Sequence, residues 1–223
     1  MSLSFELVMF DLDGTLIATA PEIFDAVNDT MREFKLQEVS QEQVNTWIGH
    51  GTRELLIKAV ALREQVDPQT LRGSAHFAEM NKAFDDHYLN RCGTRSALYP
   101  RVRETLAKLR ERGVKIAVVT NKEDRYTQAV LDAHQITSML DLVVSGDTLP
   151  TKKPDPAGVT FCLRTFGVAP DRALFVGDSS IDVATARNAG VRAWALPYGY
   201  NMGEPIDASQ PDRVIADCSA LTE

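Results

Sequence analysis

Short apolar segments alternate with longer amphipathic ones, and this alternation constrains the fold more than any other feature of the chain. The short segments are Leu7–Phe10, Val114–Val119, Leu142–Val144, Ala173–Val176 and Val191–Leu196. Each is rich in β-branched or aromatic residues and ends in a Gly, Asp, Thr or Ser cluster, which is typical of strands buried on both faces. The intervening stretches predict the helices Arg101–Arg112, Glu123–His134, Pro156–Phe166 and Ile181–Ala189. The order strand–helix–strand predicts a parallel sheet with helices on both faces and right-handed crossovers.

One long segment interrupts this alternation. Between Ile17 and about Arg91 the pattern indicates no strand and favours four amphipathic helices instead. These are expected at Pro21–Phe34, Gln41–Trp47, Thr52–Gln65 and Pro68–Asn90. An all-helical insertion directly after the first strand predicts a cap over the carboxyl edge of the sheet. The expected fold is therefore an α/β, Rossmann-like core at residues 1–16 and 92–223 with a helical cap at residues 17–91.

Composition excludes several classes of protein. The 223 residues include 31 Asp and Glu against 24 Lys and Arg, a net charge of −7, which disfavours nucleic acid and anionic membranes as partners. The three cysteines are an odd number without a C-x-x-C pair, and the longest apolar runs fall far short of the roughly 20 residues of a membrane helix. The N-terminus has no basic segment followed by a long apolar one. We expect a cytoplasmic monomer or homodimer.

Polar residues gather where the predicted strands end. Ligands of open α/β sheets bind outside the carboxyl ends of the strands. The residues expected at this edge are Asp11, Asp13, Thr120, Asn121, Lys153, Asp178 and Asp182. Carboxylates this close together must take up protons or bind a cation, and a small set of oxygen ligands without His or Cys suits Mg²⁺. With a lysine and a nucleophilic carboxylate, the set predicts phosphoryl transfer.

The order of these residues resembles the signature motifs of the haloacid dehalogenase-like hydrolases. The matching residues are Asp11-x-Asp13-Gly14-Thr15-Leu16, Thr120 at a strand end, Lys153-Pro154 and Gly177-Asp178-x-x-x-Asp182. They span nearly the whole chain, and the helical block resembles the first cap type of that superfamily. The resemblance implies a Mg²⁺-dependent enzyme that acts on a small phosphate-ester substrate.

The resemblance also implies a role for each matching residue. Asp11 would attack phosphorus and carry the aspartyl-phosphate, and Asp13 would protonate the leaving alcohol and later take a proton from water. Mg²⁺ would be held by the side chains of Asp11 and Asp178 and by the backbone carbonyl of Asp13. An acid at position 13 suits an alkoxide leaving group, which favours a phosphatase or a phosphomutase over a dehalogenase.

The remaining roles concern the phosphate and the surroundings of Asp11. Thr120 and the backbone amide of Asn121 would bind phosphate oxygens, and Lys153 would neutralise Asp11 and the phosphoryl charge. Asp182 would orient the site without touching the substrate. A purely structural reading, in which Asp182 only supports a helix N-terminus, stays open.

Three further stretches resemble the bacterial phosphoglycolate phosphatases. They are Trp47–Gly51, Ala117–Lys122 and Pro197–Ile206. This resemblance implies hydrolysis of 2-phosphoglycolate to glycolate and phosphate. The chain departs from the pattern at Ala18-Thr19, where members often carry Asp-Ser.

The cap is a candidate source of substrate specificity. Gly51 and Thr52 open a predicted helix whose free amides could bind an anion, and Arg53 could clamp a carboxylate. We hypothesise that these three residues bind the carboxylate of phosphoglycolate; the alternative for Arg53 is a surface charge.

Two alternative functions can be compared with the residues that follow the first predicted strand. A dinucleotide-binding enzyme needs G-x-G-x-x-G there, and this chain has Asp11–Leu16 instead. A non-catalytic phosphate-binding protein on the same fold would be expected to lose Asp11 or Asp13, and both are present.

Overall fold

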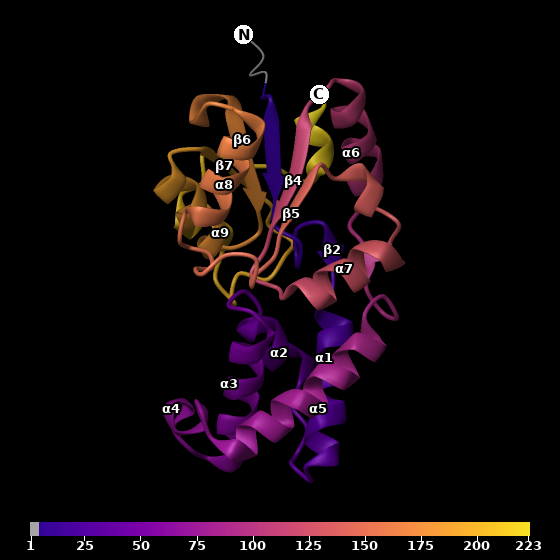
Figure 1. Ribbon diagram of the computed structural model, residues 1–223, viewed down its shortest axis with the longest axis vertical. Coiled ribbons are helices and arrows are strands. Elements are labelled where there is room, and N and C mark those ends of the chain that lie inside the picture. Colours follow the sequence, from indigo (N-terminus) through magenta and orange to yellow (C-terminus); the bar gives the residue numbers. More distant parts are fainter. Residues whose placement is uncertain (1–4) are drawn as a thin grey trace.

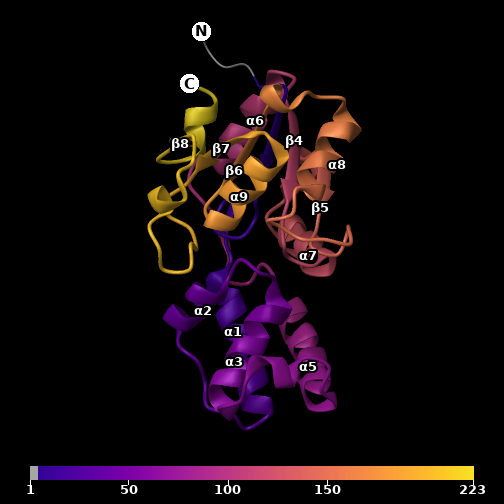
Figure 2. The same ribbon diagram turned by 90° about the vertical axis from the view of Figure 1, so that its left-hand side faces the viewer.

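The computed structural model describes residues 5–223, which form an α/β part and a helical part (Figures 1 and 2). The helical part, here called the helical lobe, comprises α1 (Ala20–Glu33), α2 (Gln41–Trp47), α3 (Thr52–Glu64), α4 (Pro68–Leu71) and α5 (Ala75–Arg91). Both views place it at one end of the elongated molecule, with the C-terminus at the other end.

The α/β part is built on a six-stranded sheet with the order β5-β4-β1-β6-β7-β8. Its strands are β1 (Leu7–Phe10), β4 (Lys115–Val119), β5 (Leu142–Val144), β6 (Ala173–Gly177), β7 (Arg192–Ala195) and β8 (Arg213–Val214). Every neighbouring pair is parallel. All four residues of β1 are buried, because this strand lies at the middle of the sheet with helices on both sides.

Two helical layers cover the sheet. Val8 and Phe10 of β1 pack with α6 (Val102–Glu111) and α7 (Asp124–Ala133). Leu7 and Met9 face the other way and pack with α8 (Ala157–Phe166) and α9 (Ser180–Ala189). This arrangement confirms the predicted α/β parallel sheet with helices on both faces. The 3₁₀ helices are η1 (Thr137–Met139), η2 (Pro170–Arg172), η3 (Ile206–Ser209) and η4 (Cys218–Leu221).

The structure differs from the expected elements at the junction with the helical lobe. Residues Ile17–Ala18, expected to carry no strand, form β2 and pair antiparallel with β3 (Ala97–Leu98). We call this pair the linking ribbon, because it connects the lobe to the sheet. The C-terminal strand β8 was not expected either. A strand of two residues is too short to show an alternation of apolar and polar side chains. Such strands are therefore recognised only by their backbone pairing with another strand in the folded protein.

The expected helix Pro68–Asn90 is in fact two helices, α4 and α5. Gly73 separates them with a φ of 83°, a conformation that glycine adopts without steric cost. The Ser74 side chain then accepts a hydrogen bond from the Phe77 amide and caps the start of α5.

The helical lobe has a hydrophobic core that also includes Tyr126 of α7. Met31 of α1, Val60 of α3 and Phe84 of α5 are among its buried members. Within residues 5–223, no helix combines the length and the apolar character that crossing a membrane requires.

Candidate active site

Three neighbouring strands bring the candidate residues together at the carboxyl edge of the sheet. Asp11 follows β1, Thr120 follows β4 and Asp178 follows β6, and these strands lie side by side in the order β4-β1-β6. β4 and β5 lie on one side of β1, and β6, β7 and β8 lie on the other, so the strand order reverses at β1. Open α/β sheets bind ligands at the carboxyl ends of the strands beside such a reversal.

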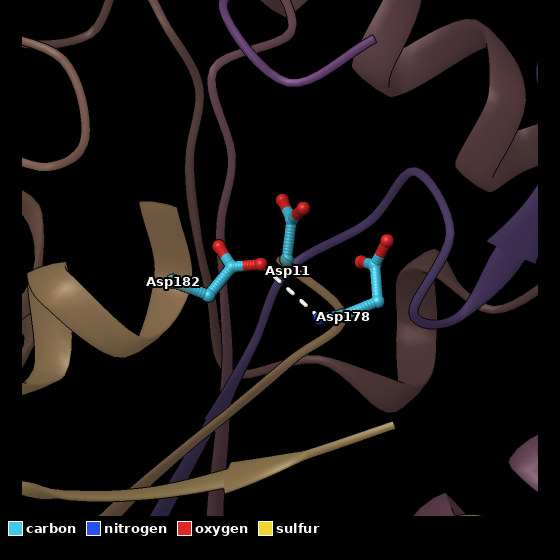
Figure 3. Close-up of side chains that lie close together, drawn as sticks. All are labelled: Asp11, Asp178 and Asp182. Atoms are coloured by element: carbon cyan, nitrogen blue, oxygen red, sulfur yellow. Dashed lines mark hydrogen bonds between the residues drawn. The ribbon is translucent and has the colours of Figure 1, made fainter. Parts of the chain in front are cut away.

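Three carboxylates form a buried cluster there. One oxygen each of Asp11, Asp178 and Asp182 lies within 4.8 Å of the others, with Asp11 between its two neighbours (Figure 3). The exposed fractions of these residues are 8%, 2% and 1%. Because burial removes the water that stabilises a carboxylate, the cluster needs positive charge nearby.

Lys153 supplies part of that charge. Its Nζ lies 2.7 Å from Asp11 Oδ1 and 2.6 Å from Asp182 Oδ1. Burial lowers the pKa of Lys153, but Asp11 and Asp182 raise it by more, so the pKa stands above its ordinary value. Lys153 therefore stays a cation, but it is one positive charge against three carboxylates.

The remaining excess of negative charge appears in the pKa values of Asp11 and Asp178. Burial raises the pKa of Asp11 to about 6, against the lowering effect of Lys153. Burial, followed by repulsion from Asp182 and Asp11, also raises the pKa of Asp178 well above its ordinary value. A further cation at this place would relieve both groups.

Asp182 is already saturated with hydrogen bonds. Its Oδ1 accepts from Lys153 Nζ, while Oδ2 accepts from the Ser179 hydroxyl at 2.7 Å and from the amides of Asp178 and Ser179. Asp182 thus ties Lys153 to the start of α9 and holds the loop that carries Asp178.

Close backbone approach fixes the position of Asp178. A Cβ atom at Gly14 would come within 2.3 Å of Asp178 Oδ2, and one at Gly199 within 2.2 Å. Only glycine fits at these two positions. The Thr15 hydroxyl donates to Asp178 Oδ1 and the Tyr200 amide donates to Oδ2, each at 2.6 Å.

The side chain of Asp13 lies outside the three-carboxylate cluster. Its Oδ1 accepts from the Thr19 hydroxyl at 2.6 Å, and its Oδ2 lies 2.9 Å from Lys122 Nζ. Burial lowers the pKa of Lys122, but Asp13 raises it by more, so the net pKa is raised. Asp11 and Asp13 thus face different cations although they are two residues apart.

Thr120 and Asn121 sit differently in the site. Both are buried and line the chamber between the sheet edge and the lobe. The Asn121 side chain is occupied: its Nδ2 donates to the carbonyls of Gly49 and Lys153, and its Oδ1 accepts from the Lys153 amide. The Thr120 hydroxyl accepts from the Lys122 amide at 3.2 Å but keeps its own proton to donate, so this hydroxyl and the backbone of Asn121 are available to a ligand.

The helical lobe closes this chamber from the other side. Its lining residues are Ile23, Ile48, Gly49, Gly51, Thr52 and Leu55. The cavity volume is about 20 Å³, room for about one water molecule.

Of the three residues hypothesised to bind a carboxylate, the structure brings two to the chamber. Gly51 and Thr52 line it, although the Thr52 hydroxyl donates to Glu123 Oε2 at 2.7 Å. Arg53 does not line it; its guanidinium lies 5.6 Å from the centroid of the Phe77 ring in α5. Successive residues of a helix point in different directions, so Thr52 and Arg53 cannot both face the same pocket.

Comparison with known proteins agrees with this geometry. The family model for "Haloacid dehalogenase-like hydrolase" matches residues 8–196. The chain belongs to the haloacid dehalogenase-like hydrolases. A phosphoglycolate phosphatase of Pseudomonas putida is 42% identical over 218 residues, covering 96% of this hydrolase and 78% of the relative. One of Mannheimia succiniciproducens is 38% identical over 221 residues, covering 99% and 98%.

Solved structures agree as well. A predicted phosphoglycolate phosphatase from Haemophilus somnus 129pt superposes with a TM-score of 0.90 at 33% identity, covering 98% of this hydrolase and 96% of that chain. The family and these relatives make the hydrolase a phosphatase, that is, a phosphoric monoester hydrolase.

Sequence reasoning missed several residues that hold the hydrolase's site together. Lys122 and Thr19 bind Asp13, while Thr15 and the Tyr200 amide bind Asp178. Lys122 lies in the resembling stretch Ala117–Lys122, and Tyr200 lies in the resembling stretch Pro197–Ile206. The resemblance does not indicate which side chains these residues contact, and a loop lysine is more often a solvated charge than a buried one.

Proposed function

We propose that this hydrolase is a Mg²⁺-dependent phosphatase that converts 2-phosphoglycolate to glycolate and phosphate through an aspartyl-phosphate on Asp11. The observation that carries the proposal is the Lys153 ion pair with a buried Asp11 beside Asp178. The phosphoglycolate phosphatases among its relatives support the choice of substrate.

Asp11 is the proposed nucleophile because it is the most accessible carboxylate of the cluster and has a cation beside it. It is 8% exposed, against 2% or less for Asp178 and Asp182. The ammonium of Lys153 favours the ionised, nucleophilic form and offsets charge on the transferring phosphoryl group. Thr120 and the backbone amide of Asn121 are proposed to bind the phosphoryl oxygens.

The donor set fits a magnesium ion. Asp11 and Asp178 are buried carboxylates that share this edge of the sheet with Asp182, and the ammonium of Lys153, 2.7 Å from Asp11 Oδ1, supplies only one positive charge against three carboxylates. The side chains of Asp11 and Asp178 and the backbone carbonyl of Asp13 are the proposed ligands, and all are the hard oxygens that Mg²⁺ prefers. When bound, Mg²⁺ supplies the positive charge that the cluster lacks and orients the phosphate.

Asp13 is the proposed acid and base. Its carboxylate lines the chamber but is separate from the metal-binding cluster. This separation lets Asp13 pass a proton to the leaving alcohol and later take one from the attacking water, while Asp11 stays ionised.

The helical lobe is proposed to act as a cap that moves, with residues 17–91 as the inserted unit and residues 1–16 and 92–223 as the core; of these, residues 1–4 lie outside the described part. The lobe lines the same chamber as Asp11 and Asp13. It is therefore proposed to open to admit substrate and to close over it to exclude water. Gly51 and Thr52, which line the chamber, are proposed to bind the glycolate carboxylate; Arg53, which lies over Phe77, is not part of the proposed site.

A panel of phosphate esters tests the proposed substrate. Phosphate release is measured with 2-phosphoglycolate, p-nitrophenyl phosphate and several sugar phosphates, each with Mg²⁺ and with a chelator. We expect 2-phosphoglycolate to give the highest kcat/KM and the chelator to abolish activity. A poor rank for 2-phosphoglycolate with retained Mg²⁺-dependent turnover would overturn the substrate but not the phosphatase.

Magnesium should stabilise the protein more at pH 7.5 than at pH 5. The folded pKa of Asp11 is about 6 without metal, against 3.8 for the unfolded chain. Desolvation therefore costs folding stability progressively as pH rises from about 4 to about 6. Mg²⁺ offsets this cost and meets less competition from protons at higher pH.

The measurement is the Tm at each pH with and without Mg²⁺. Asp178→Asn serves as the control, since it removes a proposed ligand and should shrink the Mg²⁺-dependent shift at pH 7.5. An equal shift at both pH values would contradict a site made of these carboxylates.

A further inference from the structure

Lys122 is a fully buried cation that joins the two parts of the molecule. Its side chain is 0% exposed and its Nζ lies 2.9 Å from Asp13 Oδ2. The same Nζ donates a hydrogen bond of 2.6 Å to the hydroxyl of Tyr88 and lies 4.8 Å from the centroid of its ring. Asp13 belongs to the α/β part, whereas Tyr88 belongs to α5 of the helical lobe.

Tyr88 is itself held firmly. It is fully buried, and its ring packs against those of Phe84 and Tyr126, with centroids 5.5 Å and 4.6 Å away. Tyr126 comes from α7, so the aromatic cluster spans the contact between lobe and α/β part. The Tyr88 hydroxyl can therefore reach Lys122 only while the lobe is seated.

We propose that Tyr88 is a positioning residue for the acid–base step: with the lobe seated, its hydroxyl fixes Lys122, and Lys122 in turn fixes the Asp13 carboxylate. The inference rests on the proposed role of Asp13 and adds to it a residue of the helical lobe. It makes the seating of the lobe a condition for full acid catalysis.

The physical reason lies in the pairing of a buried ammonium. Lys122 has two oxygen partners, the Asp13 carboxylate at 2.9 Å and the Tyr88 hydroxyl at 2.6 Å, and no exposed surface through which its ammonium could turn to water. A buried ammonium that loses one of its partners is left incompletely paired, which is costly. Without the Tyr88 hydroxyl, the ammonium is no longer fixed from the lobe side, and the Asp13 carboxylate that it contacts loses a defined position.

The other oxygen of Asp13 depends on the lobe as well. It accepts from Thr19, which directly follows β2 of the linking ribbon and precedes α1. One oxygen of Asp13 is thus held by a residue at the start of the lobe, and the other by Lys122, whose second partner Tyr88 belongs to the lobe. Asp11 is different, because its partner Lys153 is held by Asp182 within the α/β part.

The test compares two leaving groups in Tyr88→Phe, which keeps the packed ring and removes only the hydroxyl. Glycolate leaves as an alkoxide and needs a proton, whereas p-nitrophenolate leaves without one. We expect kcat/KM for 2-phosphoglycolate to fall about tenfold and kcat/KM for p-nitrophenyl phosphate to stay within about twofold. The kcat/KM value covers the steps up to departure of the alcohol, so hydrolysis of the phospho-enzyme does not obscure the comparison.

Tyr126→Phe is the matched control. It removes another buried tyrosine hydroxyl between lobe and α/β part, the one that donates to Asp85 at 2.5 Å, without touching Lys122. We expect it to leave the ratio of the two kcat/KM values unchanged. Equal losses with both substrates in Tyr88→Phe, or the same change of ratio in Tyr126→Phe, would overturn the proposal. Failure of the proposed function itself would look different, because the parent enzyme would then hydrolyse neither ester, or would hydrolyse p-nitrophenyl phosphate but not 2-phosphoglycolate.

Discussion

Asp11→Asn is expected to lower phosphate release by at least about 10⁴-fold with any ester, because removing a nucleophile removes the covalent route itself. The amide is nearly isosteric with the carboxylate but cannot attack phosphorus. The substitution also removes one proposed charged Mg²⁺ ligand and one of the two ionic partners of Lys153. The measurement is initial-rate phosphate release with saturating Mg²⁺, for both 2-phosphoglycolate and p-nitrophenyl phosphate.

Stability separates loss of chemistry from loss of fold in this variant. Asp11 is one of three buried carboxylates that share a single lysine, so removing its charge relieves repulsion. We expect the Tm of Asp11→Asn without Mg²⁺ to equal or exceed that of the parent, as active-site substitutions often do. Asp171→Asn is the control: Asp171 is exposed and lies ahead of β6, at the opposite edge of the sheet. An Asp11→Asn enzyme with a tenth of the parent's activity would contradict a nucleophile at this position.

The main strands of the sheet were predictable from sequence because they form short apolar runs, and β1 and β6 are buried on both faces. Runs such as Leu142–Val144 and Ala173–Val176 became β5 and β6 with almost the expected bounds. Glycines at the ends of α8 and α9 take the left-handed conformation, with φ of 67° at Gly167 and 70° at Gly190. Each of these features depends on local pattern alone.

The linking ribbon and the partners of Asp13 could not be predicted, because they depend on distant pairing. Ile17 pairs with Leu98, 81 positions along the chain. Lys122 meets Tyr88 only after the lobe has packed against α7. A single sequence without its fold gives no reason to join these residues.

The residues of the candidate site also fall into a group that the sequence predicts and a group that it does not. Residues placed by strand ends, such as Asp11 and Asp178, meet because the sheet order brings them together. Residues of the helical lobe are placed by helix rotation, which the sequence constrains only loosely. Arg53 illustrates this, since a shift of one position along α3 decides between the chamber, where Thr52 lies, and the Phe77 ring.

Lys153→Met should be the most damaging single substitution for stability and activity together. It removes the only cation among those of residues 5–223 that contacts Asp11, and it leaves Asp11 and Asp182 buried without an ionic partner. Breaking a buried ion pair on one side costs about 3 kcal/mol or more. We expect the free energy of unfolding without Mg²⁺ to fall by that amount.

The activity of Lys153→Met should fall by about 10³-fold or more. Lys153 lowers the pKa of Asp11, so its loss lets burial raise that pKa further above about 6 and favours the protonated carboxyl. A protonated carboxyl is a poor nucleophile. Mg²⁺ should restore more stability to this variant than to the parent, because it then supplies the only positive charge in the cluster.

Lys152→Met is the matched control, because it makes the same substitution at the adjacent position. Lys152 is 38% exposed in its side chain and lies 3.5 Å from Glu123, so Lys152→Met should change stability by no more than about 0.5 kcal/mol. Urea unfolding with and without Mg²⁺, together with kcat/KM for p-nitrophenyl phosphate, measures both variants. If the two lysine variants lost stability and activity equally, surface charge and not the buried ion pair would govern the site. If only Lys153→Met loses stability and activity, then one cation has two roles. Lys153 offsets the repulsion among the buried carboxylates, and it also keeps Asp11 in its ionised, nucleophilic form.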